Sequence, residues 1–231
     1  MNKIFFLLLF SAAALPLPAA DLNALPTPMA QGGMIHVYVS FQDVLSNSFS
    51  VSTDAGTPQL KPLSLWAPGD NFLPADPWYN ALSPSAQGLP FNSQYGFLID
   101  SATSDFPPSG TSIGIQLLSA TPGLQAHFYR GTDPKAFTPV FTPSHDYVLW
   151  NGNMWHPVFT APGAGNYEAT FRFFLANASA ASVADFTTTA GAVPGYSTAD
   201  VTFQFTSVPE PSTLLLSAFG FGALLWRWRR R

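Results

Sequence analysis

Two histidines and one aspartate lie close enough in the sequence to suggest a metal site. His145 and Asp146 precede the dipeptide Asn151-Gly152, and His156 follows it. Asn-Gly is a strong signal for a two-residue hairpin because both residues accept positive φ. A hairpin here would bring both imidazoles into one part of a sheet, and imidazole and carboxylate groups bind zinc and similar divalent ions. His145, Asp146 and His156 are therefore the candidate ligands of a divalent metal. The interpretation that we favour is that these are partly buried sheet histidines with backbone partners, so we expect no cofactor.

Carboxylates offer two further kinds of chemistry. Six aspartates lie within two residues of Gly, Pro, Asn or Ser, where aspartate usually caps a turn. Loop carboxylates also bind calcium, but no D-x-D-x-D-G loop occurs and we assign no calcium ligand. A glycosidase needs two facing carboxylates, and Asp100 with Asp105 is the pair that the sequence offers. Because neither H-E-x-x-H, a glycine-rich phosphate loop nor S-x-x-K occurs, we predict that the protein is not an enzyme and name no catalytic residue.

Large aromatic side chains suggest either sugar stacking or a packed core. The five candidates are Trp66, Trp78, Tyr79, Trp150 and Trp155. We predict core positions, because large aromatic side chains dominate the packing energy of protein cores.

The elements that would position these residues are β-strands. Apolar and polar residues alternate in many short segments, separated by turn residues, and no amphipathic helix is apparent. This pattern predicts an all-β body that forms a single β-sandwich, of jelly-roll or immunoglobulin-like topology. Residues 53–93 are rich in proline and aromatics and are expected to form an ordered loop, with one short helix near 77–82. The predicted strands are 34–41, 47–52, 94–99, 111–118, 124–130, 136–141, 146–150, 155–160, 166–176 and 199–206.

Composition favours a secreted domain. The chain has 231 residues, 22 prolines and no cysteine, which excludes a thiol nucleophile, a disulfide and cysteine-ligated zinc. Residues 21–207 keep four of the nine basic residues and twelve of the thirteen acidic ones, so their formal net charge is near −8. An acidic surface repels phosphates, so we expect no nucleic-acid partner.

The first 20 residues have the pattern of a secretory signal. Lys3 supplies the positive charge, an apolar run begins at Ile4, and small residues end the segment at Ala19 and Ala20. We therefore predict an N-terminal signal helix over 1–20, cleaved after Ala19 or Ala20.

The last 24 residues, 208–231, contain three features in direct succession. Pro209, Glu210 and Pro211 form a rigid triplet, because proline fixes φ and removes a backbone donor. Residues 214–226 are apolar or small apart from Ser217. The run predicts a transmembrane helix, although ordinary spans need about 20 apolar residues. Tryptophans prefer the membrane interface and arginines stay on the cytoplasmic side; the flanking set is Trp226, Arg227, Trp228, Arg229, Arg230 and Arg231.

This tail resembles the PEP-CTERM sorting signal of Gram-negative bacteria, in which a Pro-Glu-Pro triplet, an apolar helix and arginines follow one another. The resemblance implies export, temporary retention in the inner membrane and processing near the triplet by an exosortase. It also implies delivery to the cell surface or to an exopolysaccharide matrix. The same tail is sometimes labelled an ice-binding protein C-terminal domain, a label that would describe sorting. The alternative is an ordinary C-terminal anchor.

The sequence thus predicts three parts: a signal peptide (1–20), a β-sandwich body (21–207) and a sorting tail (208–231). We expect the body to be structural or adhesive, with exopolysaccharide as a partner beside the exosortase and the inner membrane. A zinc-binding surface protein and a matrix glycosidase are the alternatives.

Overall fold

Every regular element that the structure describes is a β-strand. The computed structural model describes residues 33–42, 46–61, 89–101, 107–130, 136–143, 145–181, 184–185 and 190–208. The all-β class is therefore confirmed for this part of the chain. The predicted signal helix, the helix near 77–82 and the C-terminal membrane helix lie outside the described residues. Among the residues described, no helix is long and apolar enough to cross a membrane.

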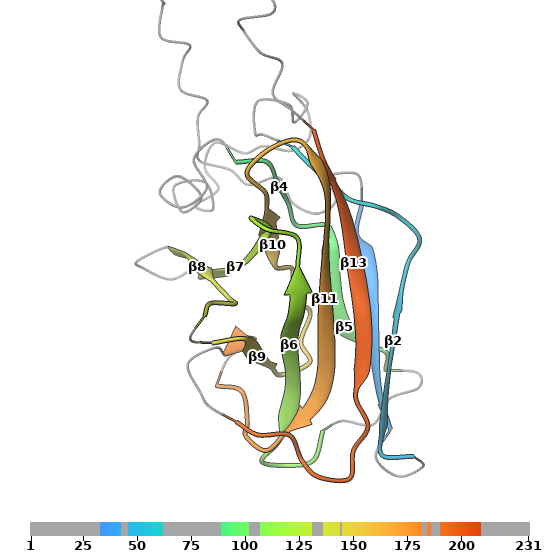
Figure 1. The fold of residues 1–231 in the computed structure, drawn as a ribbon. Helices are drawn as coiled ribbons and strands as arrows, with labels where there is room; N and C mark the ends of the chain where they lie inside the picture. Colours follow the sequence, from blue (N-terminus) through green and yellow to red (C-terminus); the bar gives the residue numbers. More distant parts are fainter. Residues whose placement is uncertain are drawn as a thin grey trace, which may run out of the picture.

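The described strands form three sheets (Figure 1). The first has the order β2 (Ser48–Thr53), β1 (Ile35–Gln42), β5 (Tyr95–Ile99). The second has the order β4 (Phe91–Asn92), β10 (Val158–Thr160), β7 (Gln125–Arg130), β8 (Ala136–Pro139). The third has the order β12 (Ala184–Asp185), β9 (Tyr147–Trp150), β6 (Ser112–Ala120), β11 (Gly165–Ala176), β13 (Ala199–Ser207), β3 (Gln59–Leu60). The β1–β5 and β13–β3 pairs are parallel, and the other pairs are antiparallel.

All ten predicted strands are present, with ends that differ by a few residues. Apolar and polar residues alternate along these strands because successive side chains of a strand point to opposite faces of the sheet. In β11, Phe171 and Phe173 are buried whereas Asn166 and Glu168 are exposed. The prediction missed β3, β4 and β12, because a two-residue strand is too short to show alternation.

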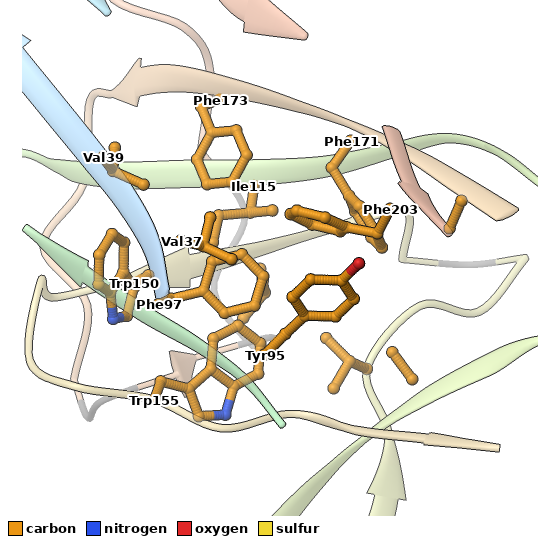
Figure 2. Close-up of a cluster of buried hydrophobic side chains, with 14 of the residues drawn as sticks. Val37, Val39, Tyr95, Phe97, Ile115, Trp150, Trp155, Phe171, Phe173 and Phe203 are labelled. Atoms are coloured by element: carbon orange, nitrogen blue, oxygen red, sulfur yellow. The ribbon is translucent and has the colours of Figure 1, made fainter. Parts of the chain in front are cut away.

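One apolar core receives side chains from all three sheets. Phe97 of β5 lies near its centre, and Figure 2 shows aromatic rings around it. Its ring centroid lies 5.5 Å from that of Trp155, 6.3 Å from Trp150 and 5.6 Å from Phe203. Aromatic pairs contribute about 0.5–1.5 kcal/mol each beyond the area that they bury. The predicted core positions of Trp150 and Trp155 are confirmed; Trp66, Trp78 and Tyr79 lie outside the described residues.

The predicted hairpin at Asn151-Gly152 is wrong. β9 pairs with β6 and β12, whereas β10 pairs with β4 and β7, so the two strands belong to different sheets. Gly152 has a φ of +87°, but Asn47 is the only described non-glycine residue with positive φ. Asn151 instead accepts a hydrogen bond from the Asn153 amide on its side-chain oxygen, at 3.0 Å.

The tryptophans on either side of this turn explain the change of sheet. Trp150 is fully buried and donates from Nε1 to the Asn153 carbonyl at 2.7 Å. Trp155 forms a two-way backbone bridge with Phe97, at 2.8 and 3.1 Å. Burying both indoles beside Phe97 carries the chain from one sheet to another instead of back along the same sheet.

The turn at residues 121–123 also changes sheet. It joins β6 to β7, with the Leu124 amide donating to the Thr121 carbonyl at 3.0 Å and Gly123 at a φ of +89°.

Candidate functional site

A row of polar side chains crosses four neighbouring strands of the third sheet. Gln116 of β6 is the direct partner of Tyr147 in β9 on one side and of Arg172 in β11 on the other. Arg172 in turn faces Asp200 of β13. Paired residues of adjacent strands share a face, and strands lie about 4.8 Å apart. Tyr147, Gln116, Arg172 and Asp200, here called the polar row, therefore span about 14 Å of the sheet surface away from the core.

The polar row borders a hollow of about 380 Å³, here called the Tyr147 hollow. Its lining combines aromatic, amide, carboxylate and guanidinium groups with small residues. The lining residues are Gln116, Asp146, Tyr147, Arg172, Phe174, Ala190, Ala192 and Thr198. A volume of this order is typical of a small-ligand site.

Two interactions hold the charged groups of the hollow in place. Gln116 donates from Nε2 to Oδ2 of Asp146 at 2.7 Å. Arg172 donates from Nε and Nη2 to the two carboxylate oxygens of Asp200, each at 2.8 Å. These hydrogen bonds lower the pKa of Asp200 and raise the pKa of Arg172. Both side chains are about 40% exposed, with values of 39% and 43%, so the pair contributes little to stability and remains accessible to a ligand.

Tyr147 is the aromatic wall of the hollow. Its ring centroid lies 4.9 Å from that of His145 and 6.1 Å from that of Phe174. The Tyr147 hydroxyl accepts a hydrogen bond from the Ala190 amide, which fixes the ring. His145 has no hydrogen-bond partner at either ring nitrogen among the residues described, although both nitrogens are buried.

His156 lies in a different environment from His145 and Asp146. Its Nδ1 donates to the Ser93 carbonyl at 3.1 Å, and its ring packs over Gly96 of β5. A Cβ at Gly96 would lie 2.4 Å from Cε1 of His156, so only glycine leaves room for the imidazole. Burial lowers the pKa of His156.

The metal site was predicted because a hairpin would bring both histidines together, and that hairpin does not form. His145 and Asp146 flank the Tyr147 hollow, whereas the His156 ring packs against β5, a strand of another sheet. The described ranges contain no group of three or more His, Asp or Glu residues placed to hold a metal ion. The metal assignment of these three residues stays a prediction without that support.

The sequence analysis missed a hydrogen-bonded pair of a histidine and an aspartate beside His156. His36 of β1 approaches Oδ2 of Asp54 with Nδ1 at 2.6 Å, and the Asp54 carboxylate also accepts from the His36 amide at 3.1 Å. These hydrogen bonds lower the pKa of Asp54. The two residues are 18 positions apart, and only the antiparallel pairing of β1 and β2 brings them together.

A buried histidine, His127, lies on β7 between β10 and β8. Its Nε2 lies 3.1 Å from Oγ1 of Thr160, and burial lowers its pKa to about 4. The sequence analysis assigned no role to His127, because the pattern of a single strand does not show which of its polar residues other strands will bury.

One catalytic pattern also escaped the sequence search. Residues 110–114 read Gly-Thr-Ser-Ile-Gly and match G-x-S-x-G. In a hydrolase this pattern lies on a tight turn from a strand to a helix. Here Ser112 begins strand β6, is buried, and donates from Oγ to the Ala178 carbonyl at 2.6 Å. Of the proposed glycosidase pair, Asp100 directly follows β5, and Asp105 lies outside the described residues.

The sorting residues Pro209, Glu210 and Pro211 and the flanking residues 226–231 lie beyond the last described residue, Val208. A family model described as the PEP-CTERM protein-sorting motif matches residues 207–231. The chain carries a PEP-CTERM sorting signal. The resemblance stated above is thus confirmed.

The PEP-CTERM signal indicates export and sorting through an exosortase, with a membrane-anchored precursor that is processed at the cell surface. No curated protein and no solved structure matches the chain.

Proposed function

We propose that the body is a structural or adhesive protein of the cell surface or exopolysaccharide matrix of a Gram-negative bacterium, and that it binds polysaccharide at the Tyr147 hollow. The observation that carries the proposal is the polar row, which presents an aromatic ring, an amide and an ion pair side by side on an open sheet face.

The chemistry of the row suits a sugar chain. Neighbouring hydroxyl groups of a sugar both donate and accept hydrogen bonds. Gln116 has both donors and an acceptor, Arg172 has donors only, and the carboxyl oxygens of Asp146 and Asp200 are acceptors. Tyr147 adds an apolar ring face against which the C–H groups of a sugar ring can pack. Because the row continues across four strands, it offers several successive contacts to an extended chain.

We further propose that the body is one sandwich between a cleaved signal peptide (1–20) and the sorting tail (208–231), which anchors the precursor in the inner membrane. Support for the single sandwich comes from the shared core and from backbone bridges between sheets, such as Phe97 with Trp155 and Lys61 with Phe91.

The test uses the processed protein released by the producing cells. Its cosedimentation with the producer's polysaccharide is measured for wild type, Gln116→Ala and Gln204→Ala. Gln204 is a matched control, because it is an exposed glutamine on the same sheet face outside the hollow. Loss of one hydrogen bond, about 0.5–1.5 kcal/mol, weakens binding about 2- to 10-fold.

We expect Gln116→Ala to show this weaker binding to the polysaccharide and Gln204→Ala to bind like wild type. Equal binding by all three proteins, or no binding by the wild type, would reject the Tyr147 hollow as the adhesive site. Stoichiometric zinc in the same preparation would favour the metal-binding alternative, and shortening of the polysaccharide would favour the glycosidase alternative.

A further inference from the structure

The body is held in its sheet up to the residue that precedes the sorting triplet. β13 lies between β11 and β3. The Thr206 amide donates to the Pro58 carbonyl at 3.1 Å, and the Val208 amide donates to the Leu60 carbonyl at 2.9 Å. Phe205, three residues before Val208, is fully buried. The last strand cannot leave the sheet without exposing this core, so the tail begins directly at the folded surface.

The length of the tail then fixes which end of the body faces the membrane. Leu214, where the apolar run begins, lies six positions after Val208. An extended chain covers at most about 3.5 Å per residue, so this connection reaches about 20 Å. In the membrane-anchored precursor, the end of the body at Val208 must therefore lie next to the membrane. The β6–β7 and β10–β11 turns lie at this same end (Figure 1).

A polar hollow of about 530 Å³ opens at this end, here called the tail-end groove. It follows the outer face of β11 and β13 close to the point where β13 stops. Its lining residues are Thr57, Thr121, Asn166, Tyr167, Glu168, Gln204, Phe205 and Thr206. Thr206 lies three residues before Pro209, which is about 10 Å along a strand. The groove is therefore within reach of an enzyme that holds the triplet in its active site.

The charge of the groove indicates whether a lipid surface or a protein surface binds there. Glu168 is exposed and is the only charged residue of the lining. An anionic lipid surface attracts lysine and arginine, and this lining has neither. Hydroxyl and amide groups around one carboxylate suit a protein surface with hydrogen-bonding groups and one basic side chain.

We propose that the tail-end groove is a docking surface for the exosortase, which binds the folded body there while it holds the triplet. Docking raises the effective concentration of the triplet at the active site, because the two contacts are joined by a very short connection. This proposal rests on the sorting signal and is independent of polysaccharide binding.

The absence of cysteine from the chain allows a direct test in the full-length precursor. Glu168→Cys is coupled to a photoactivated crosslinker in membranes that contain a tagged exosortase. Ser50→Cys is the control, because Ser50 is an exposed position of β2 that lines neither hollow, and the start of β2 contacts Ser197, next to the end of β13 that is opposite to Val208. We expect a crosslink to the tagged enzyme from position 168 and none from position 50.

A kinetic arm measures release of the processed body in a pulse-chase experiment. Glu168→Lys should slow release several-fold, whereas Ser50→Lys should be released at the wild-type rate; the melting temperatures of the released proteins show that both fold. Crosslinking from position 168 to lipid alone, or equal release rates for both lysine variants, would overturn the proposal. Neither result depends on whether the Tyr147 hollow binds sugar.

Discussion

His127 should make the protein less stable below neutral pH, by an amount that follows from its burial. It is fully buried, and burial lowers its pKa to about 4 from the ordinary 6.5. In the unfolded chain the imidazole binds a proton at about pH 6.5, whereas in the folded protein it stays neutral down to about pH 4. The unfolded state therefore binds more protons between these values. The stability contributed by neutral His127 is fully present above pH 6.5 and is lost as the pH falls towards 4.

The size of this loss can be estimated. One pKa unit corresponds to about 1.4 kcal/mol, so the shift of His127 costs about 2 kcal/mol at pH 5 and about 3 kcal/mol at pH 4. Domains are stable by only about 5–15 kcal/mol, so one histidine accounts for a large share.

The assay is urea unfolding of the processed protein between pH 7.5 and pH 4, for wild type and His127→Gln. Glutamine does not titrate and can still bond to the Thr160 hydroxyl, which lies 3.1 Å from Nε2 in the wild type. His156, Asp54 and Asp200 titrate in both proteins and cancel in the difference. Relative to the variant, wild type should lose about 3 kcal/mol between pH 7.5 and pH 4. A difference that does not change with pH would refute the assignment of a neutral buried imidazole.

Three further outcomes are expected. Phe97→Ala should lower the free energy of unfolding by about 3–5 kcal/mol, measured in urea, because it empties the centre of the aromatic core. Gly96→Ala should lower the free energy of unfolding by about 1–3 kcal/mol, because the added methyl group clashes with His156. Gly163→Ala is the control and should melt like wild type, because nothing lies within 4 Å of its added Cβ. Equal melting temperatures for the Gly96→Ala and Gly163→Ala variants would refute the close packing of Gly96 and His156. A reporter fused after Arg231 should be active only if it works in the cytoplasm, because arginines hold that end inside, and activity of a periplasmic reporter would contradict this topology.

Strand positions could be predicted from the sequence because alternation is a local property. The segment that becomes β11 shows its buried and exposed faces in its own residues. Pairing is not local. β1 pairs in parallel with β5, about 60 residues later, and no turn signal marks that partnership. At Asn151-Gly152 the local signal was misleading, since the burial of Trp150 and Trp155 decides where the chain goes.

The candidate site was less predictable than the strands for the same reason. Tyr147, Gln116, Arg172 and Asp200 come from four separate strands, and only the register of the third sheet aligns them. His145 and Asp146, the metal ligands that the sequence predicts, lie at the border of the hollow beside this row. The sorting signal could be read without any structure, because its recognition depends on contiguous residues.

The most direct test of the sorting function changes only the triplet. Pro209-Glu210-Pro211 is replaced by three alanines in the full-length chain, and membrane, surface and medium fractions are compared with wild type after a pulse of synthesis. The variant should accumulate in the inner membrane as the unprocessed precursor, since the exosortase no longer recognises it, while wild type moves to the surface or the medium. Release of the alanine variant at the wild-type rate, with the same mature size, would contradict sorting by this tail.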